Sequence, residues 1–227
     1  MKESNGKKSG YAVVVIICAF ILNFASNYPQ YQLSPMAHVI IPAYNIDVAQ
    51  FSSLFSASMI SGILLGIVAG VLCDKFGAKT CIGIAAVISL FGVVGRIFAS
   101  NYTVLFLCMV ISGLGNTFLN SNLAKIMGSW FAPERIGLAV GISLAGSTTA
   151  MAVAMSTTAM LPSLSTAFII AAVVSAIAIV VWFALIRIPP SHADNFTMPE
   201  MPTTSVKAGF VTGAKTKDNW IVGLQFG

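Results

Sequence analysis

Long apolar runs alternate with short polar segments along the whole chain. Six runs are roughly 20 or more residues long, which is the length needed to cross about 30 Å of hydrocarbon at about 1.5 Å per residue. They cover approximately Tyr11–Tyr31, Phe51–Cys73, Cys81–Ser100, Thr103–Ile126, Ile136–Leu161 and Ser165–Ile186. A seventh run begins at Trp220. The pattern predicts an all-α membrane protein with a bundle of six transmembrane helices.

The composition supports the membrane assignment and excludes several function classes. Apolar residues make up 57% of the chain and charged residues 8%, against about 45–50% and about 25% in soluble domains. The net charge of +5 lies between the apolar runs rather than on a basic face, so we expect a lipid bilayer and no nucleic acid as partner. The runs contain no His, Asp or Glu for acid–base work, so we expect no enzyme activity. No motif indicates a cofactor or a metal site.

The basic residues between the runs predict the orientation, because cytoplasmic loops carry an excess of Lys and Arg. With a cytoplasmic N-terminus, all of the 12 basic residues except Arg96 lie on the cytoplasmic side. This predicts a multi-pass protein of the inner or plasma membrane. We expect Arg96, at the outer end of its run, to snorkel toward the interface, although it could also attract anions to an entrance.

The polar segments define four parts of the chain. Residues 1–10 form a cytoplasmic tail, 11–187 the six-helix bundle, 188–218 a proline-containing cytoplasmic central linker, and 219–227 the start of a truncated seventh transmembrane helix. We expect the first outer connection, Gln32–Gln50, to be a loop. A linker followed by a new span implies a second, C-terminal six-helix half as partner.

Two pairs of asparagines suggest an internal repeat. Asn23 and Asn27 in the first run recur as Asn116 and Asn120 in the fourth run, at the same offset of 93 positions. Six-helix halves of transporters can be built from two inverted three-helix repeats. The offset therefore predicts a 3+3 arrangement.

The same asparagines are candidates for solute binding, because polar residues within membranes usually face a bundle interior or a water-filled cavity. Asn23, Asn27 and Tyr31 have the i, i+4, i+8 spacing that places residues on one helix face. The candidate substrate-binding residues are Asn23, Asn27, Tyr31, Asn116, Asn120 and Ser147. Such a wall suits a polar or anionic small-molecule solute. In the alternative interpretation, these amides only hydrogen-bond neighbouring helices.

Glycines at every fourth position occur in two of the predicted helices. Gly62, Gly66 and Gly70 lie in the second run, and Gly137 and Gly141 in the fifth. Because small residues at this spacing let two helix backbones approach closely, we expect both stripes to pack against neighbouring helices.

The turn between the second and third runs reads GVLCDKFGAK, residues 70–79. It resembles the signature of the major facilitator superfamily in the same loop, with Ala78 where the family usually has arginine. The matching residues are Gly70, Asp74, Lys75, Gly77 and Lys79. The resemblance implies the N-terminal half of a twelve-helix transporter, with these residues in conformational gating. Residues 130–137 are similar to the family's loop between helices four and five, which implies a related gating role for Glu134 and Arg135.

Departures from the family pattern narrow the expected function. Met109 stands where many members have an arginine, the fifth run lacks a glycine–proline pair, and the second run has no arginine. What remains is most similar to the branch of oxalate–formate antiporters and monocarboxylate carriers. This implies a symporter or antiporter that moves a small organic anion, such as a mono- or dicarboxylate, by alternating access. The alternatives are an exporter of drugs or other metabolites and a non-transporting six-helix membrane subunit or scaffold.

Overall fold

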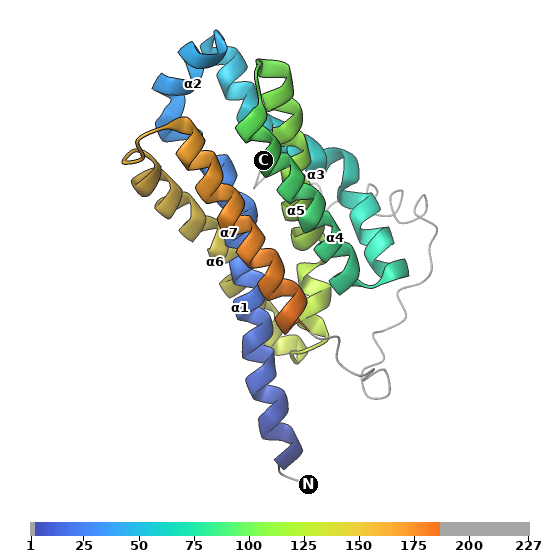
Figure 1. The fold of residues 1–227 in the computed structure, drawn as a ribbon. Helices are drawn as coiled ribbons and strands as arrows, with labels where there is room; N and C mark the ends of the chain where they lie inside the picture. The colour runs from blue at the N-terminus through green and yellow to red at the C-terminus, as the bar shows by residue number, and fades with distance from the viewer. Residues whose placement is uncertain (1–2, 187–227) are drawn as a thin grey trace, which may run out of the picture. The chain divides into compact units, whose positions relative to one another are not determined.

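The computed structural model describes residues 3–186, with side chains from Tyr11 onward, and this part of the chain consists of helices joined by short connections (Figure 1). The long helices are α1 (Glu3–Tyr31), α3 (Val48–Phe76), α4 (Ala78–Gly95), α5 (Tyr102–Gly128), α6 (Pro133–Thr158) and α7 (Leu164–Leu185). Shorter elements are η1 (Ser34–Met36), α2 (Ala37–Tyr44) and η2 (Arg96–Phe98). Six spans are long and apolar enough to cross a membrane, which confirms the predicted six-helix bundle. The predicted linker and seventh helix lie outside the described residues.

The first connection differs from its expected form. Most of Gln32–Gln50 is helical, because η1 and α2 follow α1 before the chain turns at Asn45, which has a left-handed backbone (φ 49°). Asp47 then caps α3: its carboxylate accepts from the backbone of Gln50 at 2.6 Å, and the Gln50 side chain accepts from the backbone of Asp47 at 3.1 Å. The expected loop is therefore wrong, and a capping box fixes the start of α3. At the N-terminus, helix α1 already begins at Glu3, within the predicted tail.

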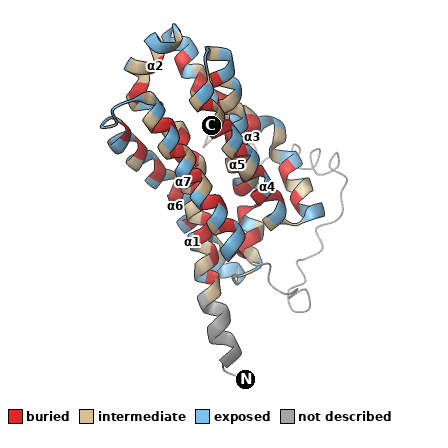
Figure 2. Cartoon of the chain, in the orientation of Figure 1, coloured by how far each residue is buried: buried red, intermediate tan, exposed pale blue. Residues whose placement is uncertain are grey.

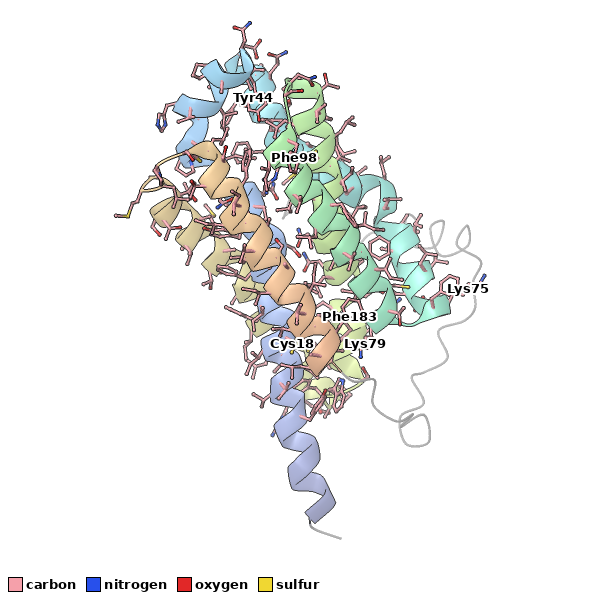
Figure 3. All side chains as sticks on the ribbon, in the orientation of Figure 1. Cys18, Tyr44, Lys75, Lys79, Phe98 and Phe183 are labelled. Atoms are coloured by element: carbon pink, nitrogen blue, oxygen red, sulfur yellow. The ribbon has the colours of Figure 1, made fainter. Side chains whose placement is uncertain are left out.

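The two ends of the bundle carry different side chains, and Figure 3 labels some of them at each end. Lys75 and Lys79 lie at the turn between α3 and α4, here called the Gly77 end, and Tyr44 and Phe98 lie at the opposite, Asn101 end. Gly77 adopts φ 86°, ψ 134° between the two helices, a conformation that glycine tolerates best. At the Asn101 end, Asn101 accepts from Val104 N at 2.9 Å and caps α5. The predicted orientation places the Gly77 end in the cytoplasm.

The helices pack as two similar groups. In one group α1 lies against α6 and α7, in the other α5 lies against α3 and α4, and α1 also contacts α5. Close backbone crossings occur in both groups. A Cβ on Gly146 of α6 would collide with the carbonyl of Phe20 in α1, a Cβ on Gly113 of α5 would collide with the carbonyl of Ser58 in α3, and a Cβ on Gly92 of α4 would collide with the α5 backbone. Phe20 and Gly113 are 93 positions apart, the offset of the asparagine pairs. The Gly146 and Gly113 crossings therefore involve corresponding points of α1 and α5 in the predicted repeat.

The glycine stripes do not provide these close contacts. A Cβ on Gly62 would lie 3.7 Å from Thr117 Oγ1, an ordinary contact, and one on Gly70, Gly137 or Gly141 would meet no atom of residues 11–186 within 4 Å. Only 22% of the apolar span of α3 and of α6 is buried, against 50% for α4, and exposed surface follows both helices in Figure 2. Among residues 11–186 no neighbour packs closely against these last three positions, because glycine spacing identifies a smooth helix face but not whether a neighbour covers it.

Candidate functional site

Four asparagines join α1 to α5 through their side-chain amides. Asn23 Nδ2 donates to Asn120 Oδ1 at 3.0 Å, and Asn27 Nδ2 donates to Asn116 Oδ1 at 3.1 Å. The first asparagine of α1 thus pairs with the second of α5, and the second with the first. This crosswise pairing is what two helices of opposite direction, related by an inverted repeat, would make.

Hydrogen bonds within each helix complete this asparagine quartet. Asn27 Nδ2 also contacts Asn23 Oδ1 at 2.9 Å, and Asn120 Nδ2 donates to Asn116 Oδ1 at 2.7 Å. Asn23 is fully buried and Asn27 nearly so, whereas Asn116 is half-buried and Asn120 is exposed. The quartet therefore has one side closed by protein and one open side on α5.

The open side of the quartet retains hydrogen-bonding capacity. A side-chain amide offers two N–H donors and an oxygen with two lone pairs, and the amide of Asn120 is not enclosed by neighbouring side chains. The bridging of helices that the alternative interpretation expected is present. Contact with a solute stays a prediction, and the geometry leaves room for both roles.

The two other candidate residues lie apart from the quartet's hydrogen bonds. Tyr31, beyond Pro29 in α1, is half-buried and packs against a small apolar cluster that contains Tyr28 and Ala154. Ser147 is half-buried and follows Gly146, the residue at the closest approach of α6 to α1. The spacing that placed Tyr31 with Asn23 and Asn27 assumes a regular helix, and Pro29 interrupts the backbone hydrogen bonds between them.

The Gly77 turn carries an ion pair. Lys125 Nζ in α5 contacts Asp74 Oδ1 at the end of α3, at 2.7 Å, and also approaches the Gly70 carbonyl at 3.5 Å. Both side chains reach solvent, with 40% of Lys125 and 66% of Asp74 exposed. The pair therefore fastens α3 to α5 from within this bundle.

The remaining gating candidates surround the same end. Lys75 lies 5.3 Å from the ring of the neighbouring Phe76, and the carbonyl of Lys79 accepts from the buried indole of Trp182 in α7 at 3.2 Å. Glu134 and Arg135 are exposed in the first turn of α6, and neither forms an ion pair with a side chain in residues 11–186. They are free to contact an element outside the described residues.

The sequence profile of the Major Facilitator Superfamily matches residues 15–224, which is most of the chain. The chain belongs to the Major Facilitator Superfamily. This agrees with the six-helix bundle and with the GVLCDKFGAK signature at the Gly77 turn. The protein is therefore a multi-pass membrane protein of a transporter superfamily, and the described residues have the fold of an N-terminal superfamily half.

Individual superfamily members are similar to parts of the chain. It is 26% identical over 135 residues to the hexuronate transporter of Bacillus subtilis, covering 59% of this chain and 32% of that protein. It is 30% identical over 142 residues to monocarboxylate transporter 1 of Mus musculus and 28% identical to the human protein, covering 61% of this chain and 28% of either transporter. The matches thus span about a third of the length of these relatives. They confirm the resemblance to the carrier-like branch of the superfamily.

The structure places two basic side chains, Lys125 and Arg96, in contacts that the sequence did not predict. The sequence places Lys125 only among the cytoplasmic charges, although its position in the last turn of α5 could suggest contact with the adjacent turn. Arg96 does not snorkel: its side chain is fully buried, and Nη1 donates to the Pro29 carbonyl at 2.8 Å. The prediction of an interfacial arginine is wrong, because η2 lies against α5 and α7 and the Pro29 carbonyl of α1 offers an acceptor inside the protein.

Proposed function

We propose that this chain is the N-terminal half of a secondary active transporter that moves a small organic anion, such as a mono- or dicarboxylate, by alternating access. The observation that carries the proposal is the asparagine quartet, which joins the two repeat-related helices α1 and α5 and has an open side at Asn116 and Asn120. A solute that contacts this open side near the middle of the bundle would replace its water with amide contacts.

The choice of an anion is supported by what the relatives are named for. The similar proteins are a hexuronate transporter and monocarboxylate transporters, and both solute classes carry a carboxylate. This favours an organic anion over the drugs or other metabolites of the alternative. Uncharged amides can donate hydrogen bonds to carboxylate and hydroxyl oxygens alike.

The proposed partner is a second six-helix half. The faces of α3 and α6 that carry Gly70, Gly137 and Gly141 are open in the described bundle, and smooth faces of this kind allow close helix contact. Rocking between two halves would expose the solute first on one side of the membrane and then on the other. We propose the cell membrane as the location, with the N-terminus in the cytoplasm.

We further propose that the Gly77 turn controls this rocking. The candidate gating residues all lie at or beside the helix connections of that end; they are Gly70, Asp74, Lys75, Gly77, Lys79, Glu134 and Arg135. Asp74, held by Lys125 on one side, is still mostly exposed and can face a group of the second half. Opening and closing of such contacts would change turnover more than solute affinity.

The binding assignment is tested with Asn27→Ala and Asn120→Ala in the full-length transporter, reconstituted in proteoliposomes and assayed for uptake of D-glucuronate, L-lactate and oxalate. We expect the KM for the transported anion to rise by about tenfold or more, the effect of losing hydrogen bonds to a charged group. Membrane abundance should stay normal.

Asn122→Ala is the matched control for this experiment. Asn122 lies on the same helix and is fully buried, but it donates to the carbonyls of Ala69 and Phe118 rather than to the quartet. It should lower thermal stability and leave KM unchanged. Unchanged KM in both quartet variants would reject the binding role, and absence of uptake of all three anions by the unaltered protein would favour the exporter or subunit alternatives.

A further inference from the structure

Arg96 is a buried cation without an anionic partner in the described residues. Its guanidinium donates from Nη1 to the Pro29 carbonyl at 2.8 Å, lies 3.5 Å from Met109 Sδ and sits 5.0 Å from the centroid of the Phe168 ring. No part of the side chain reaches the surface. The acidic side chains within residues 11–186 are those of Asp47, Asp74 and Glu134, and all three are exposed and unpaired with Arg96.

The nitrogens that remain free form one edge of the guanidinium. Nε and Nη2 are both buried and have no hydrogen-bond partner. Their N–H groups point in parallel from the same edge, which is the edge that binds the two oxygens of a carboxylate. Because Nη1 is held by Pro29, the free edge has a fixed orientation. A buried arginine in a membrane protein is costly and commonly marks a functional site.

Other unpaired polar atoms lie at the same Asn101 end of the bundle. Gln32 donates from Nε2 to the carbonyl of Ala167 at 3.1 Å, beside the Phe168 ring under Arg96, and its Oε1 is buried without a partner. The buried Thr158 hydroxyl in the last turn of α6 also lacks one. A solute with a carboxylate and hydroxyl groups offers what these atoms lack, because its carboxylate accepts and its hydroxyls can donate or accept.

The backbone of α1 explains how the arginine is held and where the site can open. Pro29 has no N–H, so the Ala25 carbonyl loses its helical donor and receives the Ser175 hydroxyl at 3.4 Å instead. One turn later Leu33 N bonds to Gln30, which leaves the Pro29 carbonyl to Arg96. Proline kinks are places where a helix can bend. Bending at Pro29 would separate the Pro29 carbonyl from Arg96 and uncover the guanidinium.

Arg96 is also close enough to the asparagine quartet to share one solute pathway. Met109, which it contacts, lies seven residues from Asn116 on α5, or roughly 10 Å along the helix. On α1, Pro29 follows Asn27 by two residues. Along both helices Arg96 therefore lies between the quartet and the Asn101 end.

We propose that Arg96 is an anion-binding residue that holds the carboxylate of the transported solute through Nε and Nη2 when the Asn101 end opens. This inference rests on the proposed function, since it assigns a carboxylate contact to the same pathway. The carboxylate accepts the hydrogen bonds that Nε and Nη2 of the buried edge do not make within the bundle. Specificity for anions over neutral analogues then arises within this half.

The first test uses Arg96→Lys, which keeps the charge and a donor for Pro29 but removes the parallel edge. In proteoliposomes the variant should raise the KM for D-glucuronate, or for whichever carboxylate the unaltered protein takes up, by about tenfold to a hundredfold. Ser175→Ala is the matched control, because it removes the other side-chain contact at the Pro29 kink and leaves the guanidinium intact. Equal KM values for Arg96→Lys, Ser175→Ala and the unaltered protein would overturn the proposal.

A second measurement tests solute binding at Arg96 without measuring transport. Phenylglyoxal reacts with arginine, and mass spectrometry of the membrane-embedded protein can follow Arg96 separately from the exposed Arg135. D-glucuronate should slow modification of Arg96 at least threefold, whereas D-glucose, which lacks the carboxylate, should not. Protection without uptake would support the Arg96 site and count against the transport proposal. Arg96 that never reacts, or reacts equally with both sugars present, would overturn the site even if uptake is normal.

Discussion

The two ends of the bundle hold cations in opposite ways. At the Gly77 end, Lys125 meets Asp74 at 2.7 Å, and both side chains remain in contact with solvent. At the Asn101 end, Arg96 is fully buried, holds one backbone carbonyl and faces no carboxylate among residues 11–186. One cation is paired and exposed, and the other is unpaired and enclosed.

This difference determines how much free energy is gained or lost at each end when its contacts break or form. An exposed ion pair contributes about 0–1 kcal/mol and is weakened by salt, so it can break and form again easily. A buried charge without a counterion costs several kcal/mol. The Gly77 end therefore suits a contact that opens and closes, whereas the Asn101 end gains stability if an anion arrives.

The largest effect is expected from Arg96→Met, which removes the enclosed cation while keeping an apolar side chain of similar length. Replacement of buried charge by hydrophobic groups is often neutral or stabilising, even though the Pro29 carbonyl loses a donor. We expect thermal stability in detergent to stay equal or rise, while kcat/KM for the transported carboxylate falls by about a hundredfold or more. Thermal unfolding and uptake measured on the same preparation check both parts.

The two readouts of Arg96→Met separate a solute contact from a structural contact. If Arg96 served only to hold α1, the variant would unfold at a lower temperature, and transport would fall in proportion to the protein lost. A stable but inactive variant would instead identify the buried cation as a group retained for function at the expense of stability.

The fold was largely predictable from sequence, because an uninterrupted apolar run of about 20 residues has few other interpretations. The turn at Gly77 was also predictable, since the motif places a glycine where the backbone needs positive φ. The inward position of Arg96 was not. Sequence places a residue along a helix, but at the transition from α4 to the 3-10 turn η2 the side-chain direction depends on the tertiary contact with Pro29.

The candidate site was predictable in part. The offset of 93 positions indicated that Asn23 and Asn27 correspond to Asn116 and Asn120, but only coordinates show that they pair crosswise. Lys125 was missed because its partner Asp74 lies 51 residues earlier in the chain. Contacts between helices depend on packing and rotation, which one sequence does not specify.

A smaller effect is expected at the turn that carries the exposed pair. Gly77→Ala places a side chain at φ 86°, ψ 134°, a region that non-glycine residues rarely occupy, at a cost of about 1–3 kcal/mol. Gly70→Ala is the matched control on the same helix, because its Cβ would meet nothing within 4 Å in the described bundle and alanine is the better helix former by about 1 kcal/mol. Thermal unfolding in detergent should show a clear loss for Gly77→Ala alone. Equal losses for both would mean that general crowding, rather than backbone strain at the turn, controls this end.

The smallest effect on stability is expected from the exposed pair itself, because Lys125 and Asp74 are 40% and 66% exposed. Asp74→Asn removes the charge with little change in shape and should lower stability by no more than about 1 kcal/mol, while kcat changes several-fold and KM stays constant.

The double variant Asp74→Lys with Lys125→Asp keeps the pair but reverses it. If the contact within this half sets turnover, the double variant restores kcat; if Asp74 instead acts on a cation of the second half, kcat stays low. High salt should shift kcat of the unaltered protein toward that of Asp74→Asn, because salt weakens exposed ion pairs. A KM change of equal size would show that this end also binds solute.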